Sequence, residues 1–173
     1  MIEAKLLYNP TDCHTAYFGW GANCGPMSLA ALLSREVNDV RDLFTDFIRL
    51  KYTNPTQMEK ALQKVGATKT NTPSRGVGVV GCQLPNFGLA FLQWTGGWWD
   101  SKPIAVQYRH THWIASQKVD CVHWVYDCNS EIGWITRQEW LESMLPRFKD
   151  ELKCKGCYIR TGFEVCLAKG GRD

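Results

Sequence analysis

The stretch NCGPMSLAALLSR, residues 23–35, decides the fold, because it predicts the element on which the rest of the chain packs. It predicts a helix from Cys24 to about Arg35, because Pro26 sits in the first turn, where a missing N–H costs nothing. The residues after Pro26 leave almost no polar face, and a helix that is apolar nearly all round is buried. We therefore expect a buried helix with Cys24 at its N-terminus.

A cysteine in this place can act as a nucleophile. The unpaired N–H groups and the dipole at a helix N-terminus favour negative charge, which stabilises a thiolate. Gly25 lets a substrate backbone come close, and the Cys24 N–H can point at a developing oxyanion. The alternative is an inert buried cysteine, with Gly25 and Pro26 serving only to start the helix.

Helices dominate the expectation for the first half of the chain. Apolar residues at i, i+3 and i+4 spacing predict a helix over 39–50. A second is expected over 56–65, where Thr56 and Glu59 form a capping-box pattern and Gly66 ends the stripe. Residues 1–23 read as irregular, 67–88 as a long surface loop, and 87–94 as a short helix.

The second half of the chain changes to the period of strands. Strands are expected over 103–109, 111–117, 122–128 and 133–136, with a last strand or hairpin over 157–168. Between them, Thr136 and Glu139 form a capping-box pattern that opens a helix, which Pro146 should bend or end. Antiparallel strands that follow helices indicate an α+β fold, here as one domain over 1–173.

A histidine and an aspartate of this second half are candidate partners for the cysteine. His112 precedes an apolar run, as expected at the entry of a core strand. If the following hairpin is centred between Val119 and Asp120, His112 lies directly opposite Asp127, with Cβ atoms roughly 4.5–5.5 Å apart. A carboxylate there would hold the imidazole in the right tautomer and stabilise the imidazolium.

The same register gives a second candidate pair, because it places His110 opposite Asn129. A slip of one residue would move each of these side chains to the other face of the sheet. The plain alternative is a cross-strand histidine–aspartate pair that has no catalytic role.

These three segments together resemble the papain-like cysteine peptidase superfamily, over about residues 14–128. The likeness is greatest to its compact bacterial branches, the bacteriocin-processing peptidase domains and the papain-like effector proteases. It implies a papain-like fold and a thiol protease that works through a thioester, with Cys24 as nucleophile, His112 as general base and acid, and Asp127 orienting the histidine. The segments are Asn23-Cys24-Gly25-Pro26, His112-Trp113-Ile114-Ala115 and Val125-Tyr126-Asp127.

The chain departs from the pattern of these families at two places. They usually carry a glutamine six residues before the nucleophile as an oxyanion donor, and here that residue is Phe18. Asn23, or the indole N–H of Trp20, could take its place. Asp127 is followed by Cys128, where the families often have proline.

The expected partner is a protein or peptide substrate. Trp98 and Trp99, together with the 67–88 loop, are the expected wall of its binding groove, and the chemistry requires no cofactor and no metal. Three alternatives stay open: a protein deamidase or acyltransferase on the same triad, a catalytically inactive binding domain, and a zinc-binding module. The last is suggested by Cys154 and Cys157, which have the CxxC spacing of zinc ligands.

Composition excludes other classes of function. The chain has 173 residues, a net charge of +3, 45% hydrophobic and 21% charged residues. Its basic residues are spread out, which argues against nucleic-acid binding. No run approaches the roughly 20 apolar residues of a membrane span, and residues 1–10 do not read as a secretory signal. The expected location is the cytoplasm, of a bacterium or phage or of a host cell into which the protein is delivered, with cysteines mostly reduced.

Overall fold

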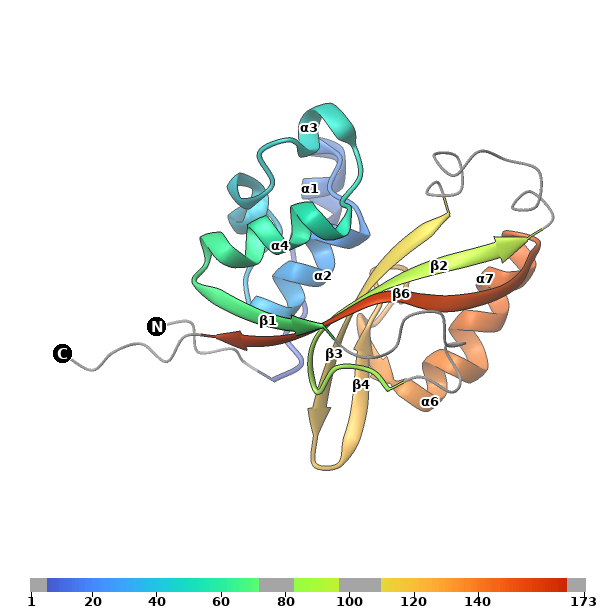
Figure 1. Ribbon diagram of the computed structural model, residues 1–173. Helices are drawn as coiled ribbons and strands as arrows, with labels where there is room; N and C mark the ends of the chain where they lie inside the picture. Colours follow the sequence, from blue (N-terminus) through green and yellow to red (C-terminus); the bar gives the residue numbers. More distant parts are fainter. Residues whose placement is uncertain (1–5, 72–82, 97–109, 168–173) are drawn as a thin grey trace.

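The computed structural model describes residues 6–71, 83–96 and 110–167, and it is an α+β protein (Figure 1). Six antiparallel strands in this part of the chain form one sheet, in the order β1-β6-β2-β3-β4-β5. The strands are β1 (Ala67–Asn71), β2 (Phe87–Gly96), β3 (Thr111–Val119), β4 (Val122–Tyr126), β5 (Trp134–Thr136) and β6 (Cys154–Leu167).

Helical segments cover both faces of the sheet. Most of them come from the first half of the chain and lie on one side, and the rest lie on the other side (Figure 1). The first group contains α1 (Cys13–Trp20), α2 (Cys24–Leu33), the 3₁₀ segment η1 (Asn38–Leu43), α3 (Phe47–Leu50) and α4 (Pro55–Lys64). The second contains α6 (Arg137–Glu139), the π-helical segment η3 (Trp140–Met144) and α7 (Leu145–Glu151).

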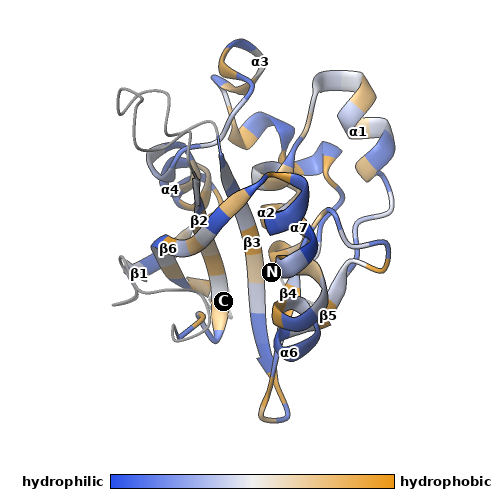
Figure 2. Ribbon diagram, turned by 90° about the vertical axis from the view of Figure 1, so that its right-hand side faces the viewer, coloured by the Kyte–Doolittle hydropathy of each residue, from blue (hydrophilic) through white to orange (hydrophobic). Residues whose placement is uncertain are grey.

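Two hydrophobic cores follow from this arrangement, because successive side chains of a strand point to opposite faces. On β2, Leu89 and Phe91 belong to the core beneath α1, α2 and α4. Ala90 and Leu92 belong to the core that also contains Trp140. Figure 2 shows β3 turning hydrophilic toward its hairpin end, where Lys118 is exposed.

The helix predicted from Cys24 is confirmed. In α2 every residue from Gly25 to Leu33 is buried, as expected for a helix without a polar face. The helix predicted over 56–65 is also present as α4. Its capping box, however, is formed by Asn54 and Gln57, two residues earlier than expected, with Pro55 as the first helical residue.

Several local predictions are wrong. Residues 87–94 form the strand β2 instead of a short helix. Residues 13–20 form α1, although 1–23 was expected to be irregular. The helix expected over 39–50 is divided into η1 and α3. Residues 67–71 of the expected loop belong to β1, while 72–82 and the expected strand over 103–109 lie outside the described residues.

Pro146 does not end the last helical stretch, which continues to Glu151. A proline lacks the N–H that would complete an α-helical turn, so it is tolerated only where that donor has no partner. Here the π-helical segment η3 precedes it, and Pro146 occupies the first turn of α7. No helix in the described ranges has the length and apolar character needed to cross a membrane.

Candidate active site

Cys24 is the first residue of α2, and a cavity lies beyond this end of the helix. Asn23 caps the helix: its Oδ1 accepts from the Gly25 N–H at 3.2 Å, and its Nδ2 donates to the Lys51 carbonyl at 3.2 Å. The thiol is half-buried and lines a cavity of about 980 Å³. The sulfur therefore lies at the positive end of a ten-residue helix and next to space for a ligand.

Buried hydrogen bonds fix α2 against β3. Ser28, one turn after Cys24, donates to the Trp113 carbonyl at 3.0 Å. The Trp113 indole N–H donates in turn to the Thr53 carbonyl at 2.7 Å. Thr53 packs so closely on Gly25 that a Cβ at that glycine would lie 2.5 Å from the Cβ of Thr53. The helix tip and the histidine strand thus have one fixed relative position.

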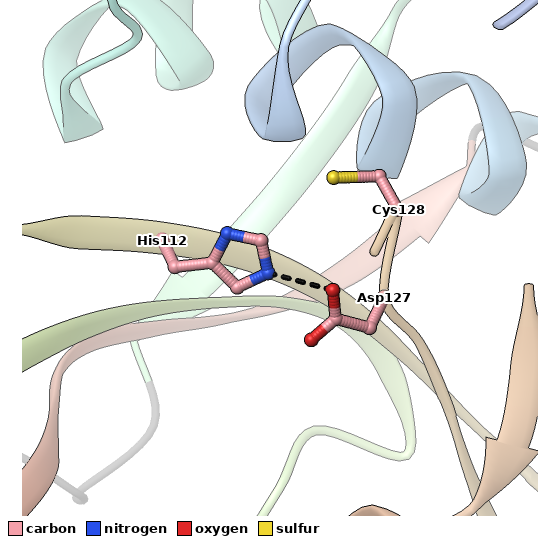
Figure 3. A group of neighbouring side chains, drawn as sticks. All are labelled: His112, Asp127 and Cys128. Carbon is pink, nitrogen blue, oxygen red and sulfur yellow. Dashed lines mark hydrogen bonds and ion pairs between the residues drawn. The ribbon is translucent and has the colours of Figure 1, made fainter. Parts of the chain in front are cut away.

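His112 and Asp127 are joined directly. The Nε2 atom of His112 lies 2.9 Å from Oδ1 of Asp127, and the two side chains are buried (Figure 3). Cys24 also acts on the His112 ring, because its charge and hydrogen-bonding capacity contribute to the raised pKa of His112. Since Nε2 is taken by the carboxylate, Nδ1 is the ring nitrogen that is left for the thiol. The imidazole is thus hydrogen-bonded to the carboxylate and has the Cys24 thiol as an electrostatic neighbour.

The predicted hairpin register is wrong, although the predicted contact exists. Ala115 pairs with Tyr126 and Val119 with Val122, so the turn is centred between Asp120 and Cys121 instead of one residue earlier. Both turn residues have a positive φ. This register shifts the pairing by two residues, which keeps each side chain on its face.

The sheet also opens at this point. The ladder between β3 and β4 covers residues 115–119 of β3, whereas the ladder with β2 continues to Thr111. Within the described residues, 112–114 thus belong to the ladder with β2 but not to the ladder with β4. This opening is the place where His112, Asp127 and the tip of α2 meet.

Asp127 is held by two residues besides His112. Its Oδ1 also accepts from the backbone N–H and from Nδ2 of Asn129, at 3.0 and 3.2 Å. Its Oδ2 accepts from the indole N–H of Trp140 at 3.0 Å. Sequence reasoning did not identify Trp140, because nothing in its local pattern separates an indole that binds a carboxylate from one that only fills a core.

The electrostatics favour an ion pair at neutral pH. Burial lowers the pKa of His112, but the charges of Asp127 and Cys24 and the hydrogen bonds to both raise it well above its ordinary value. Burial raises the pKa of Asp127, yet the attraction of His112 and the bonds from Asn129 and Trp140 outweigh it, and the pKa is lowered. The imidazolium therefore has an ionised carboxylate on one side and the thiol on the other.

The residues considered as oxyanion donors have other partners. The indole N–H of Trp20 donates to Asn38 Oδ1 at 3.0 Å, and the ring is 5% exposed. The Asn23 side chain caps α2, as described above. Phe18, the residue six positions before Cys24, is 72% exposed on α1.

The other predicted site residues fall into two groups. Asn129 donates its side-chain N–H to Asp127. The His110 carbonyl accepts from the Trp94 N–H at 3.0 Å, next to the end of the β2–β3 ladder at Thr111. His110 and Asn129 also line a second cavity of about 280 Å³, on the His112 side of the site. Trp98 and Trp99 lie outside the described residues.

Cys128 is a further thiol at the site, and it belongs to the group of side chains that could hold a metal. Ligand atoms of His112, Asp127 and Cys128 all lie within 4.8 Å of one another. Burial, followed by the charges of Cys24 and Asp127, raises the pKa of the Cys128 thiol well above its ordinary value. Cys154 and Cys157, on β6, belong to no such group among the described residues.

Neither a scan against protein-family models nor a search of curated proteins found a match to this chain.

Proposed function

We propose that this chain is a papain-like cysteine hydrolase that cleaves an amide bond, peptide or isopeptide, through a thioester intermediate. The observation that carries the proposal is the arrangement of Cys24, His112 and Asp127, in which a buried histidine is hydrogen-bonded to Asp127 and electrostatically coupled to the thiol at the tip of α2. Its members come from three separate elements and have the residue types of nucleophile, base and orienting acid. A nucleophile at the tip of a buried helix and the chain order Cys, His, Asp support the papain-like assignment.

The chemistry follows from the protonation states. With His112 as imidazolium, the Cys24 thiolate attacks the carbonyl carbon of the substrate. The imidazolium then gives its proton to the leaving nitrogen, the C–N bond breaks, and a thioester remains on the sulfur. The neutral imidazole next takes a proton from water, which attacks the thioester and releases the acid. Asp127 stays ionised throughout and keeps the ring in place.

We assign the two parts of the substrate, on either side of the scissile bond, to two different cavities. The acyl part is attached to the Cys24 sulfur, and we assign it to the cavity of about 980 Å³ that Cys24 lines with Tyr52 and Trp113. The leaving amine receives its proton from His112, and we assign its side of the substrate to the cavity of about 280 Å³ that His112 lines with Phe148. Thr111 lines both cavities and so marks the boundary between them.

Alkylation by iodoacetamide tests the nucleophile. In a mildly acidic buffer, well below the ordinary cysteine pKa of about 8.5, only a thiolate that an imidazolium stabilises should react quickly. Cys24 should therefore be labelled faster than the exposed thiols of Cys121 and Cys166 in the same molecule. Peptide mass spectrometry reads all sites in one experiment.

Histidine variants provide the control. His112→Ala should abolish the preference for Cys24, whereas His123→Ala, which changes a histidine on β4, should retain it. Equal labelling of all accessible thiols in the wild-type chain would remove the basis of the proposal.

The type of reaction is tested with a peptide library. New peptide ends that depend on Cys24 indicate hydrolysis, whereas conversion of glutamine to glutamate indicates a deamidase. An active thiolate that changes no peptide in the library would contradict hydrolysis of this substrate class. Cys24→Ala is the matched inactive variant for each comparison.

A further inference from the structure

We propose that the large cavity in front of Cys24 selects a substrate whose acyl part carries acidic side chains. The consequence, cleavage of amide bonds that follow acidic residues, rests on the proposed function. The preference of the cavity for negatively charged groups does not, because it depends only on the side chains that line it, and it can be measured separately.

The charged residues that line this cavity all have the same sign. Lys51 and Arg160 both line the cavity of about 980 Å³, and none of its described lining residues is an aspartate or a glutamate. A cleft that is lined by one sign of charge focuses the electric field and concentrates ligands of the opposite sign. The cavity next to the proposed nucleophile should therefore favour carboxylates.

Lys51 is fixed beside the segment that leads to Cys24. It follows α3 with a φ of 58°, and its carbonyl accepts from Nδ2 of Asn23 at 3.2 Å. Its Nζ donates to the Trp20 carbonyl at 3.4 Å. None of the ion pairs that the described residues form includes Lys51. The backbone and the side chain of Lys51 thus both hold this cation near the nucleophile.

Arg160 reaches the cavity from a bulge in β6. Phe91 of β2 pairs with Thr161, but the next residue, Leu92, pairs with Ile159, so Arg160 is the extra residue on β6. A bulge takes its extra residue out of the ladder and re-aims the side chain. Nη1 of Arg160 donates to Oε1 of Gln93 at 3.4 Å, and this acceptor is neutral. The irregularity in the strand therefore gives the cavity its second cation.

The cavity assigned to the leaving amine differs in charge. Among the described residues that line it, Glu151 is acidic, and neither lysine nor arginine is present. Glu151 also forms an ion pair with Arg147 at 2.8 Å. Acidic residues should therefore be favoured on the acyl side of the scissile bond and not on the amine side.

A pair of alkylating agents tests the charge preference directly. Iodoacetate carries a carboxylate, and iodoacetamide is its neutral counterpart of similar size. The ratio of their rates at Cys24 should exceed the ratio at the exposed thiols of Cys121 and Cys166 in the same molecule. An imidazolium at His112 also attracts iodoacetate, so the decisive comparison is between variants that retain this histidine.

Lys51→Met and Arg160→Met remove the charges but keep long apolar side chains. Each should lower the ratio at Cys24 about two- to fivefold, the effect of one solvent-accessible charge pair. Lys51→Arg and Arg160→Lys retain the charge and should retain the ratio. Arg49→Met is the matched control, because Arg49 pairs with Asp46 and does not line the cavity. Circular dichroism shows whether each variant folds, and an unchanged ratio in both folded methionine variants would overturn the proposal.

The peptide library described above tests the substrate class. Aspartate and glutamate should be enriched before the cleaved bond, and the double change of Lys51 and Arg160 to glutamate should abolish this enrichment. If Cys24 reacts no faster than the exposed thiols but its ratio falls in the methionine variants, the hydrolase assignment fails and the anion-selective cavity stands. If Cys24 reacts preferentially and peptides are cleaved without acidic enrichment, the proposed substrate class is refuted alone.

Discussion

The contact between Trp140 and Asp127 provides the sharpest test of how the site is built. Asp127 is fully buried, with three donors on Oδ1 and the Trp140 indole alone on Oδ2. In Asp127→Asn, the side-chain oxygen must keep the position with three donors. The new amide N–H₂ then faces the N–H of Trp140, so two buried donors oppose each other.

The size of the effect follows from these contacts. Removing one partner of a buried ion pair costs about 3–5 kcal/mol, and we expect that range for Asp127→Asn. Each buried donor left without an acceptor contributes about 1–3 kcal/mol of it. Trp140→Phe removes one of the two opposed donors, so the double variant should be about 1–2 kcal/mol more stable than the sum of the single changes predicts.

Urea unfolding of the wild type, the two single variants and the double variant at neutral pH measures this coupling. Trp20→Phe is the matched control, because its buried indole donates to Asn38 and has no contact with Asp127. That change should be additive with Asp127→Asn. Additivity within about 0.5 kcal/mol for the Trp140 cycle as well would refute the view that the indole holds the carboxylate.

Two further predictions concern stability. The folded-state pKa of Asp127 is lowered, so its carboxylate stabilises the fold above its unfolded pKa, and the stability cost of Asp127→Asn should shrink below about pH 4. The folded-state pKa of His112 is raised, so its imidazolium stabilises the fold below its unfolded pKa, and the stability cost of His112→Gln should begin to shrink above about pH 6.5. Urea unfolding across pH checks both, and costs that do not vary with pH would contradict the pairing. Gly25→Ala should destabilise by about 1–3 kcal/mol through overlap with Thr53, whereas Gly19→Ala, which meets nothing within 4 Å, should be neutral or stabilising. Equal melting temperatures for these two variants would show that Thr53 yields easily.

The helix that carries Cys24 could be predicted because its signals are local. Pro26 in the first turn and an apolar run that only Ser28 interrupts are both contained in the ten residues of α2. The strand β2 could not be predicted in this way. It lies inside the sheet with both faces covered, so residues 87–92 are apolar on both faces and show neither the period of a strand nor that of a surface helix.

The sequence predicted which face of the sheet carries the candidate site, but not the register of its strands. His112 and Asp127 were correctly expected on the same face, but the turn was placed one residue too early. The observed turn puts Cys121 at a positive φ, and a cysteine in the sequence does not predict this conformation. Trp140 reaches Asp127 from the π-helical segment η3, which follows β5 in the chain, and contacts between separate elements leave no trace in a local pattern.

The departure at Phe18 has a structural consequence for the proposed reaction. Position 18 is on the exposed side of α1, and the indole N–H of Trp20 is directed to Asn38, so neither side chain is placed to bind an oxyanion. Asn23 already uses its amide on Lys51 and its oxygen on Gly25. Stabilisation of a tetrahedral intermediate must then depend on backbone N–H groups at the start of α2, beginning with that of Cys24. Backbone donors are held by the helix itself, and contacts of Ser28 and Thr53 fix that helix against β3, so the proposed reaction does not require the glutamine.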